Sequence, residues 1–145
     1  MRKSIFILLS ALFTANQGMA QNPKLEKEVK SVLMQFIDAG DNNDAAALEK
    51  CLNENFRTAV FDAQHGGIKV LDRATYVSFI RDKKFGGYPR TAEIHSIEFI
   101  EEGMASVQVT LSSPGKPTLK NFYSLVKEVE GWKVIQDFVV LIPKE

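Results

Sequence analysis

Residues 118–142 constrain the fold of this chain more than any other stretch. Apolar residues recur two apart on either side of Glu130-Gly131, and side chains two apart share one face of a β-strand. A two-residue turn at Glu130-Gly131 predicts a hairpin, because glycine readily adopts the positive φ that such turns need. Both faces of this hairpin are mostly apolar. We therefore expect both to be covered by helices, another sheet or a second subunit.

The turn position also predicts the register of this hairpin. Counting outward from the turn places Tyr123 opposite Phe138 on one face and, on the other face, Ser124 opposite Asp137. A carboxylate in the middle of an apolar strand must be paired or partly solvated. We therefore expect Asp137 to be hydrogen-bonded to Ser124, to lie at a wet dimer rim, or to have a functional role.

A second copy of the pattern lies upstream, over residues 91–111, with its turn at Glu102-Gly103. Its register places His95 opposite Thr110. The connection between the two hairpins, residues 113–117, has the sequence SPGKP, and its prolines and glycine interrupt regular structure. Two successive hairpins predict a four-stranded antiparallel meander.

Upstream of the hairpins, hydrophobic periodicity predicts five shorter elements, with helix caps at Asp44 and Asp72 and a helix end at Gly40. In order they are a helix over 24–39, a helix over 45–52, strands over 56–61 and 68–71, and a helix over 73–81. Helices on one side of a bent antiparallel sheet form an α+β layer fold.

The first 20 residues have the order of a secretory signal peptide. Arg2 and Lys3 give a positive start, residues 5–13 are apolar, and small residues lead up to Ala20. A membrane anchor is the alternative, but the apolar run is shorter than the roughly 20 residues that span a bilayer. We expect cleavage after Ala20, one domain over residues 21–145, and a periplasmic or secreted protein without a membrane span.

The amino-acid composition limits which classes of function this chain can have. The chain has 18 basic and 18 acidic residues with its lysines scattered, so nothing predicts nucleic-acid binding. Cys51 is the single cysteine, so packing rather than an internal disulfide must stabilise the fold. Its position between Leu48 and Leu52, at helical spacing, predicts a buried and unreactive thiol.

The element order and several short motifs resemble the nuclear transport factor 2-like superfamily of cone-shaped α+β domains. The motifs are GD at 40–41, AAAL at 45–48, GMASV at 103–107 and GWKVI at 131–135. Within that superfamily, the chain is most similar to exported bacterial proteins grouped as putative lumazine-binding proteins. The resemblance implies three N-terminal helices packed on a strongly bent, mixed but mainly antiparallel sheet, a cystatin-like cone.

The resemblance also implies where a ligand and a second subunit would bind. The interior of the cone would lie between the first helix and the concave sheet, and the convex face often forms a dimer. Members include isomerases, dehydratases, ligand binders and interaction domains. The branch usually has a lysine late in the last strand, where this chain has Asp137.

Six residues are candidates for a ligand site, if they are not simply core or surface residues. They are Phe36, Tyr76, His95, Tyr123, Trp132 and Asp137. Aromatic side chains can line a pocket for a flat ligand. Burial would raise the pKa of the Asp137 carboxyl, which suits a general base near neutral pH. A neutral His95 could orient a ligand or transfer a proton.

Three functional hypotheses follow from these residues. The first is an exported, non-catalytic homodimer that binds a small hydrophobic or aromatic molecule in the cone. The second is an isomerase- or dehydratase-type enzyme that uses Asp137 with His95 or Tyr123. The third is a protein-interaction module with a filled cone. His65 and His95 lie far apart without clustered carboxylates, and no phosphate loop is present, so we expect no metal site and no cofactor.

Overall fold

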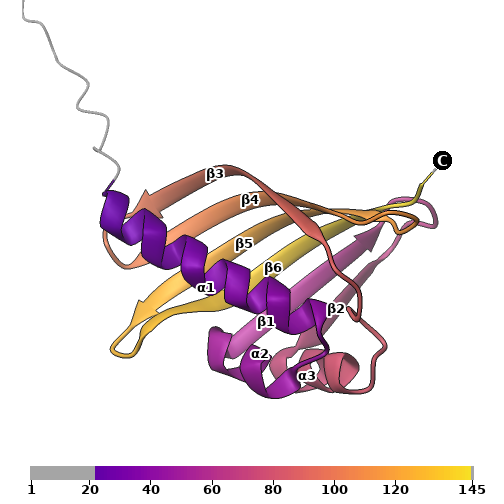
Figure 1. Cartoon of the computed structure of the whole chain (residues 1–145), viewed down its shortest axis with the longest axis horizontal. Helices are drawn as coiled ribbons and strands as arrows, with labels where there is room; N and C mark the ends of the chain where they lie inside the picture. The colour runs from indigo at the N-terminus through magenta and orange to yellow at the C-terminus, as the bar shows by residue number, and fades with distance from the viewer. Residues whose placement is uncertain (1–21, 145) are drawn as a thin grey trace, which may run out of the picture.

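The computed structural model describes residues 22–144, and the predicted signal peptide lies outside them. Its elements are α1 (Pro23–Asp41), α2 (Ala45–Cys51), β1 (Leu52–Asp62), β2 (Ile68–Asp72), α3 (Arg73–Arg81), β3 (Thr91–Ile100), β4 (Met104–Ser112), β5 (Thr118–Glu128) and β6 (Gly131–Ile142). This is the predicted order of helices and strands. Figure 1 shows α1 crossing the concave side of a curved sheet, with α2 and α3 grouped beside its C-terminal end.

The strands form one sheet in the order β2-β1-β6-β5-β4-β3. Strands β3 to β6 are the predicted antiparallel meander. Strand β1 pairs with β6 in parallel and with β2 antiparallel, so the sheet is mixed but mainly antiparallel, as predicted.

A β-bulge in β6 sets the faces of the last hairpin. Ile135 has no partner on β5, although Val134 and Gln136 on either side of it do. A bulge shifts the inward–outward alternation by one residue and bends the strand. Val134 and Asp137 are therefore both buried on the concave side, although an unbroken strand would place them on opposite faces.

The register predicted for this hairpin is wrong. The turn is Val129-Glu130 rather than Glu130-Gly131, so near the turn each β5 residue pairs with a β6 residue two positions earlier than predicted. Beyond the bulge, the difference from the predicted partner is one position. A difference of one position means that the β6 residues predicted for one face of the sheet lie on the other face. It places Asp137, rather than Phe138, opposite Tyr123.

The predicted register of the β3–β4 hairpin is also wrong. It is off by one residue near the turn, because Ile100 pairs with Met104 across a longer turn, and by two residues beyond position 95. Strand β3 has its own bulge at His95. His95 therefore has no partner on β4, and Thr110 pairs with Glu93 rather than with His95 as predicted. The two side chains still meet, since His95 Nε2 lies 2.8 Å from Thr110 Oγ1. The two bulges occur in different strands of one sheet and both favour its bending into a cone.

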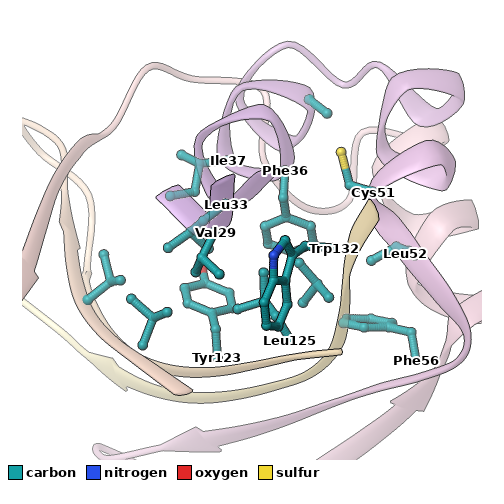
Figure 2. Packing of buried hydrophobic residues seen from close by; sticks show 14 of the residues in the cluster. Val29, Leu33, Phe36, Ile37, Cys51, Leu52, Phe56, Tyr123, Leu125 and Trp132 are labelled. Carbon is teal, nitrogen blue, oxygen red and sulfur yellow. The ribbon is translucent and has the colours of Figure 1, made fainter. Parts of the chain in front are cut away.

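The core lies between α1 and the concave face. The apolar side chains of α1 that recur three or four residues apart are buried there, and Figure 2 shows Val29, Leu33 and Phe36 directed toward Tyr123 and Leu125 of the sheet. The helix continues through the buried glycine at position 40, two residues beyond the predicted end.

The two short helices begin where their caps predict. Asp44 accepts a hydrogen bond from the Ala47 amide, and Asp72 accepts one from the Thr75 amide, both at 2.9 Å. Helix α2 ends at Cys51, whose thiol is buried as expected. Burial raises the pKa of the Cys51 thiol, which keeps it protonated and poorly nucleophilic.

Candidate functional site

A cavity of about 560 Å³ occupies the end of the cone that α3 covers. Its walls come from α1, α3, the loop between α3 and β3 (residues 82–90, here the rim loop), and strands β1, β5 and β6. Hydrophobic and aromatic side chains make up most of the wall: Phe36, Val60, Tyr76, Ile80, Phe85, Tyr88, Leu119, Tyr123, Val139 and Leu141. Ligand sites in proteins typically have volumes of about 300–1,000 Å³ and largely apolar walls.

The floor of the cavity is polar because three strands bring polar residues together. Thr58 of β1 lies opposite Asp137 of β6, which lies opposite Tyr123 of β5. Asn121 is two residues from Tyr123 on the same face of β5. All four are buried and line the cavity.

Asp137 is the central residue of this floor, with an exposed fraction of 3%. Burial raises the pKa of its carboxyl to about 7, against the opposing effects of an Asn121 hydrogen bond and the Arg90 charge. The Asn121 side-chain N–H donates to Asp137 Oδ1 at 2.9 Å. Asp137 can therefore gain or lose a proton near neutral pH.

Two buried polar atoms of the floor lack a hydrogen-bond partner within residues 22–144. They are Thr58 Oγ1 and Asn121 Oδ1. Leaving a buried polar atom unpaired costs about 1–3 kcal/mol, so native proteins rarely do so without a reason. Both residues line the cavity, and a molecule within it can supply the missing partners.

Aromatic rings make up the wall above the floor. The Phe36 and Tyr76 rings are nearly parallel at 9°, with centroids 6.2 Å apart, and Tyr123 meets Phe36 edge-on at 5.5 Å. Burial, followed by the charge of Asp137, raises the pKa of both Tyr76 and Tyr123. Their phenol groups therefore stay protonated and can donate hydrogen bonds.

An ion pair fixes the end of the rim loop to α1. The guanidinium of Arg90 pairs with the Asp41 carboxylate, and the Arg90 amide donates to the same carboxylate at 2.9 Å. Burial opposes the charge on Arg90, but the hydrogen bond and charge of Asp41 outweigh it and raise the pKa of Arg90.

Backbone contacts fix the middle of the same loop. The Gly87 amide donates to the Gly40 carbonyl at 3.1 Å, and the Asn43 side chain donates to the Phe85 carbonyl at 2.7 Å. Gly86 has a φ of +68° and lies so close to α1 that a Cβ there would be 2.0 Å from the Gly40 carbonyl oxygen. The rim loop is therefore a fixed wall of the cavity.

The outer part of the cavity is basic. Lys83 and Lys84 of the rim loop and Lys116 of the β4–β5 loop are exposed and line it. The Lys116 ammonium lies 4.9 Å from the centroid of the Tyr88 ring, so this contact joins the two loops. We call this opening, with its three lysines, the mouth.

Four of the six predicted site residues line the cavity: Phe36, Tyr76, Tyr123 and Asp137. His95 does not, because its bulge directs it outward, where it is exposed and 3.8 Å from Glu93. Trp132 is buried at the far end of the cone, against Phe99 and with its indole N–H donating to Glu28 at 3.2 Å.

Six polar residues of the cavity were not predicted: Thr58, Asn121, Arg90 and the three lysines of the mouth. Asn121 was detectable, because it is a polar residue on the same face of a strand as Tyr123 and Leu125. No local pattern points to Arg90, whose partner Asp41 lies 49 residues earlier.

Two further sites were sought in the described residues. Over residues 22–144, no three histidine, cysteine or acidic side chains gather closely enough to hold a metal ion. The helices within the same range are too short or too polar to cross a membrane.

A family model described as "Putative lumazine-binding" matches residues 24–138. No curated protein matches the chain. One similar solved structure is a nuclear transport factor 2-like protein of unknown function from Shewanella baltica. It has a TM-score of 0.74 and 15% identity, over 86% of this chain and 99% of that one.

Two other solved structures extend the comparison. A cystatin-like fold protein from Burkholderia xenovorans has a TM-score of 0.64 and 14% identity, over 86% of this chain and 96% of that one. A ketosteroid isomerase-like protein from Erwinia carotovora atroseptica has a TM-score of 0.66 and 13% identity, over 85% of this chain and 99% of that one. At these identities the similarity establishes the fold, and it confirms the predicted cone.

Proposed function

The chain belongs to the putative lumazine-binding family, and we propose that it is an exported protein that binds a small aromatic molecule in the cavity without converting it. The observation that carries this proposal is the pair of buried, unpartnered atoms, Thr58 Oγ1 and Asn121 Oδ1, in a cavity of ligand size. The cavity walls supply apolar area for a flat ring system. The floor supplies hydrogen bonds that orient it.

The floor favours a ligand edge with both donor and acceptor groups. Asn121 Oδ1 is an acceptor and requires a donor such as a ring N–H, whereas Thr58 can donate or accept. Protonated Asp137 donates and ionised Asp137 accepts. Lumazine, after which the family is named, is a flat heterocycle with amide N–H and C=O groups, and such an edge complements this floor.

Native mass spectrometry of the protein purified from its own host tests this proposal. We expect a small molecule bound at stoichiometric amount, whose mass starts its identification. Asn121→Leu removes the acceptor and the anchor of Asp137, and should reduce the bound fraction. Gln108→Leu, at an exposed position on β4, is the matched control and should leave it unchanged. A protein without any bound mass, which also fails to take up lumazine, would contradict the proposal.

Asp137 favours a second candidate function, an isomerase- or dehydratase-type enzyme. Its carboxyl has a pKa raised to about 7 by burial and lies opposite Tyr123, so a base and a hydrogen-bond donor share one cavity. His95 lies outside that cavity, which leaves Tyr123 as the only predicted partner that lines it with Asp137.

Deuterium uptake separates the two functions. An enzyme that removes a proton from carbon would introduce deuterium from D₂O into the captured molecule, and Asp137→Asn would abolish this exchange. A ligand binder would return the molecule unlabelled. The cavity itself gives no support to the third hypothesis, an interaction module with a filled cone.

The convex face of the sheet supports a homodimer. Six exposed apolar side chains cover neighbouring strands there, and we call them the convex patch: Phe61, Ile68, Val70, Phe122, Phe138 and Val140. Phe122 lies opposite Phe138, and Phe61 lies between Ile68 and Val140 in adjacent strands. A continuous apolar patch of this kind suits a second copy of the same chain.

A further inference from the structure

The charged residues that line the cavity are mostly positive. Lys83, Lys84, Lys116 and Arg90 line it, and Asp137 is the one carboxylate that does. Arg90 is neutralised by Asp41, but the three lysines form no ion pair with any residue of the described chain. The whole chain has a formal net charge of zero, so this local excess of positive charge does not reflect a generally basic chain.

Two of these lysines are held in place by aromatic rings. The Lys84 ammonium lies 4.9 Å from the centroid of the Phe79 ring, and Lys116 lies at the same distance from Tyr88. A ring face attracts the charge of an ammonium, but the group has three N–H donors and can direct others elsewhere. Both lysines are therefore partly ordered at the mouth while still able to bind an anion.

The floor has the opposite character. Asp137 and the unpartnered Asn121 carbonyl are acceptors, and an anion beside them would be repelled whenever Asp137 is ionised. The polarity of the cavity therefore runs from a basic mouth, past aromatic walls, to a floor that repels anions when Asp137 is ionised. A molecule that matches this order has an apolar body with a hydrogen-bonding inner edge and a negative outer end.

We propose that the molecule bound in the cavity carries an anionic group, such as a carboxylate, phosphate or sulfonate, which Lys84 and Lys116 bind at the mouth. This inference rests on the proposed function, since it requires a small molecule in the cavity. Beyond that function, the inference specifies that the molecule is negatively charged at one end and that this end lies at the mouth.

Two fluorescent probes that share an aromatic frame test the inference. N-phenyl-1-naphthylamine is neutral, and 1-anilinonaphthalene-8-sulfonate has the same rings with an added sulfonate. We expect the sulfonate probe to bind roughly fivefold more tightly at low salt, as two exposed ion pairs can provide, which is about 1 kcal/mol. This preference should shrink as ionic strength rises, because salt screens exposed charges.

Paired variants locate the effect at the mouth. Lys84→Gln with Lys116→Gln should weaken binding of the sulfonate probe roughly fivefold and leave the neutral probe within about twofold. The matched control is Lys24→Gln with Lys27→Gln, which removes the same charge from exposed positions on α1. It should leave both affinities unchanged.

The outcomes separate this inference from the function on which it rests. Val139→Phe places a ring in the cavity and should weaken binding of both probes. If neither probe binds to the wild type, or if Val139→Phe changes the affinity of neither probe, the proposed function itself is contradicted. If both probes bind in the cavity equally well and the mouth variants change neither, ligand binding stands and the anionic group is excluded.

Discussion

Asp137 is the residue on which the enzyme hypothesis depends, and its chemistry is set by its surroundings. Arg90, Tyr76 and Tyr123 face it around the cavity, and Asn121 donates to it. Only Arg90 carries a charge, and Asp41 neutralises much of that charge. Burial therefore dominates, and the carboxyl holds its proton to unusually high pH.

This raised pKa predicts how Asp137 changes stability with pH. The folded value of about 7 exceeds the ordinary 3.8, so the folded state binds the proton more tightly. The stabilising contribution is complete below about pH 4 and is lost as pH rises through about 7. Between pH 5 and pH 8, the wild-type free energy of unfolding should fall by about 3 kcal/mol more than that of Asp137→Asn.

Urea unfolding of both proteins at the two pH values measures this difference. Comparing the two proteins cancels the contribution of every other titrating group. Equal pH dependence in wild type and Asp137→Asn would show that Asp137 is ionised or solvated in the folded protein, and it would remove the basis for a general-base role.

At the scale of helices and strands, the sequence predicts the features that depend on contacts between residues close together in the chain. Asp44 and Asp72 indicated the starts of α2 and α3 because a cap bonds only to the next few residues. The hairpin registers were not predictable in the same way. A bulge at Ile135 is hard to detect when both faces of a strand are apolar, and without it Asp137 could not be placed opposite Tyr123.

The rim loop shows the same limit. Its contacts join segments about 40 or more residues apart, such as Asn43 with Phe85 and Asp41 with Arg90. From composition alone, residues 82–90 are only a glycine-containing connection between a helix and a strand. Its role as the wall of the cavity follows from tertiary contacts that no local pattern encodes.

Gly86 tests the attachment of this loop. Gly86→Ala combines a positive φ with a Cβ 2.0 Å from the Gly40 carbonyl oxygen, so the loop must move away from α1. Gly115→Ala is the matched control, because its φ is +75° and no atom lies within 4 Å of the added Cβ. We expect the control to lose about 1 kcal/mol of stability and Gly86→Ala about 2 kcal/mol more.

Thermal or urea unfolding compares the two glycine variants, and probe binding reports the cavity. Gly86→Ala should also weaken binding of N-phenyl-1-naphthylamine, whereas Gly115→Ala should not. Equal losses of stability in the two variants would mean that the contact between the loop and α1 contributes little.

The ion pair at the end of the rim loop makes a separate prediction. The Arg90 and Asp41 side chains are only 13% and 11% exposed, so Asp41→Asn leaves a poorly solvated guanidinium without its counter-charge. We expect a loss of about 3 kcal/mol. The control Glu49→Gln breaks the exposed pair with Arg81 at 3.5 Å and should change the free energy of unfolding by less than about 0.5 kcal/mol in urea. Similar effects of the two substitutions would contradict a structural role for the buried pair.

At the scale of the whole molecule, the two ends of the cone have different roles. Toward the β5–β6 turn, Trp132 and Phe99 fill the interior and hold α1 against the sheet. Toward α3, the rim loop and α3 hold the walls apart around the cavity. Bending the sheet creates both ends and also exposes its convex face, where the apolar patch requires a cover of its own.

The proposed dimer provides that cover and gives the last prediction. Phe138 is 49% exposed at the centre of the convex patch, opposite Phe122 on one side and Ala59 on the other. Phe138→Glu places a charge where the two sheets would meet, at a cost of several kcal/mol if it is buried without a partner. Sedimentation at micromolar concentration should show a wild-type dimer and a folded Phe138→Glu monomer.

Val129→Glu is the matched control, because Val129 is a fully exposed apolar residue at the β5–β6 turn, outside the convex patch. The same change of charge there should leave the dimer intact. A monomeric wild type would refute the dimer directly. A Phe138→Glu dimer would mean that the subunits meet through another surface, in which case the exposed phenylalanines must be explained by a different partner. Because the patch and the cavity are on opposite faces of β5 and β6, ligand binding should survive in the Phe138→Glu monomer.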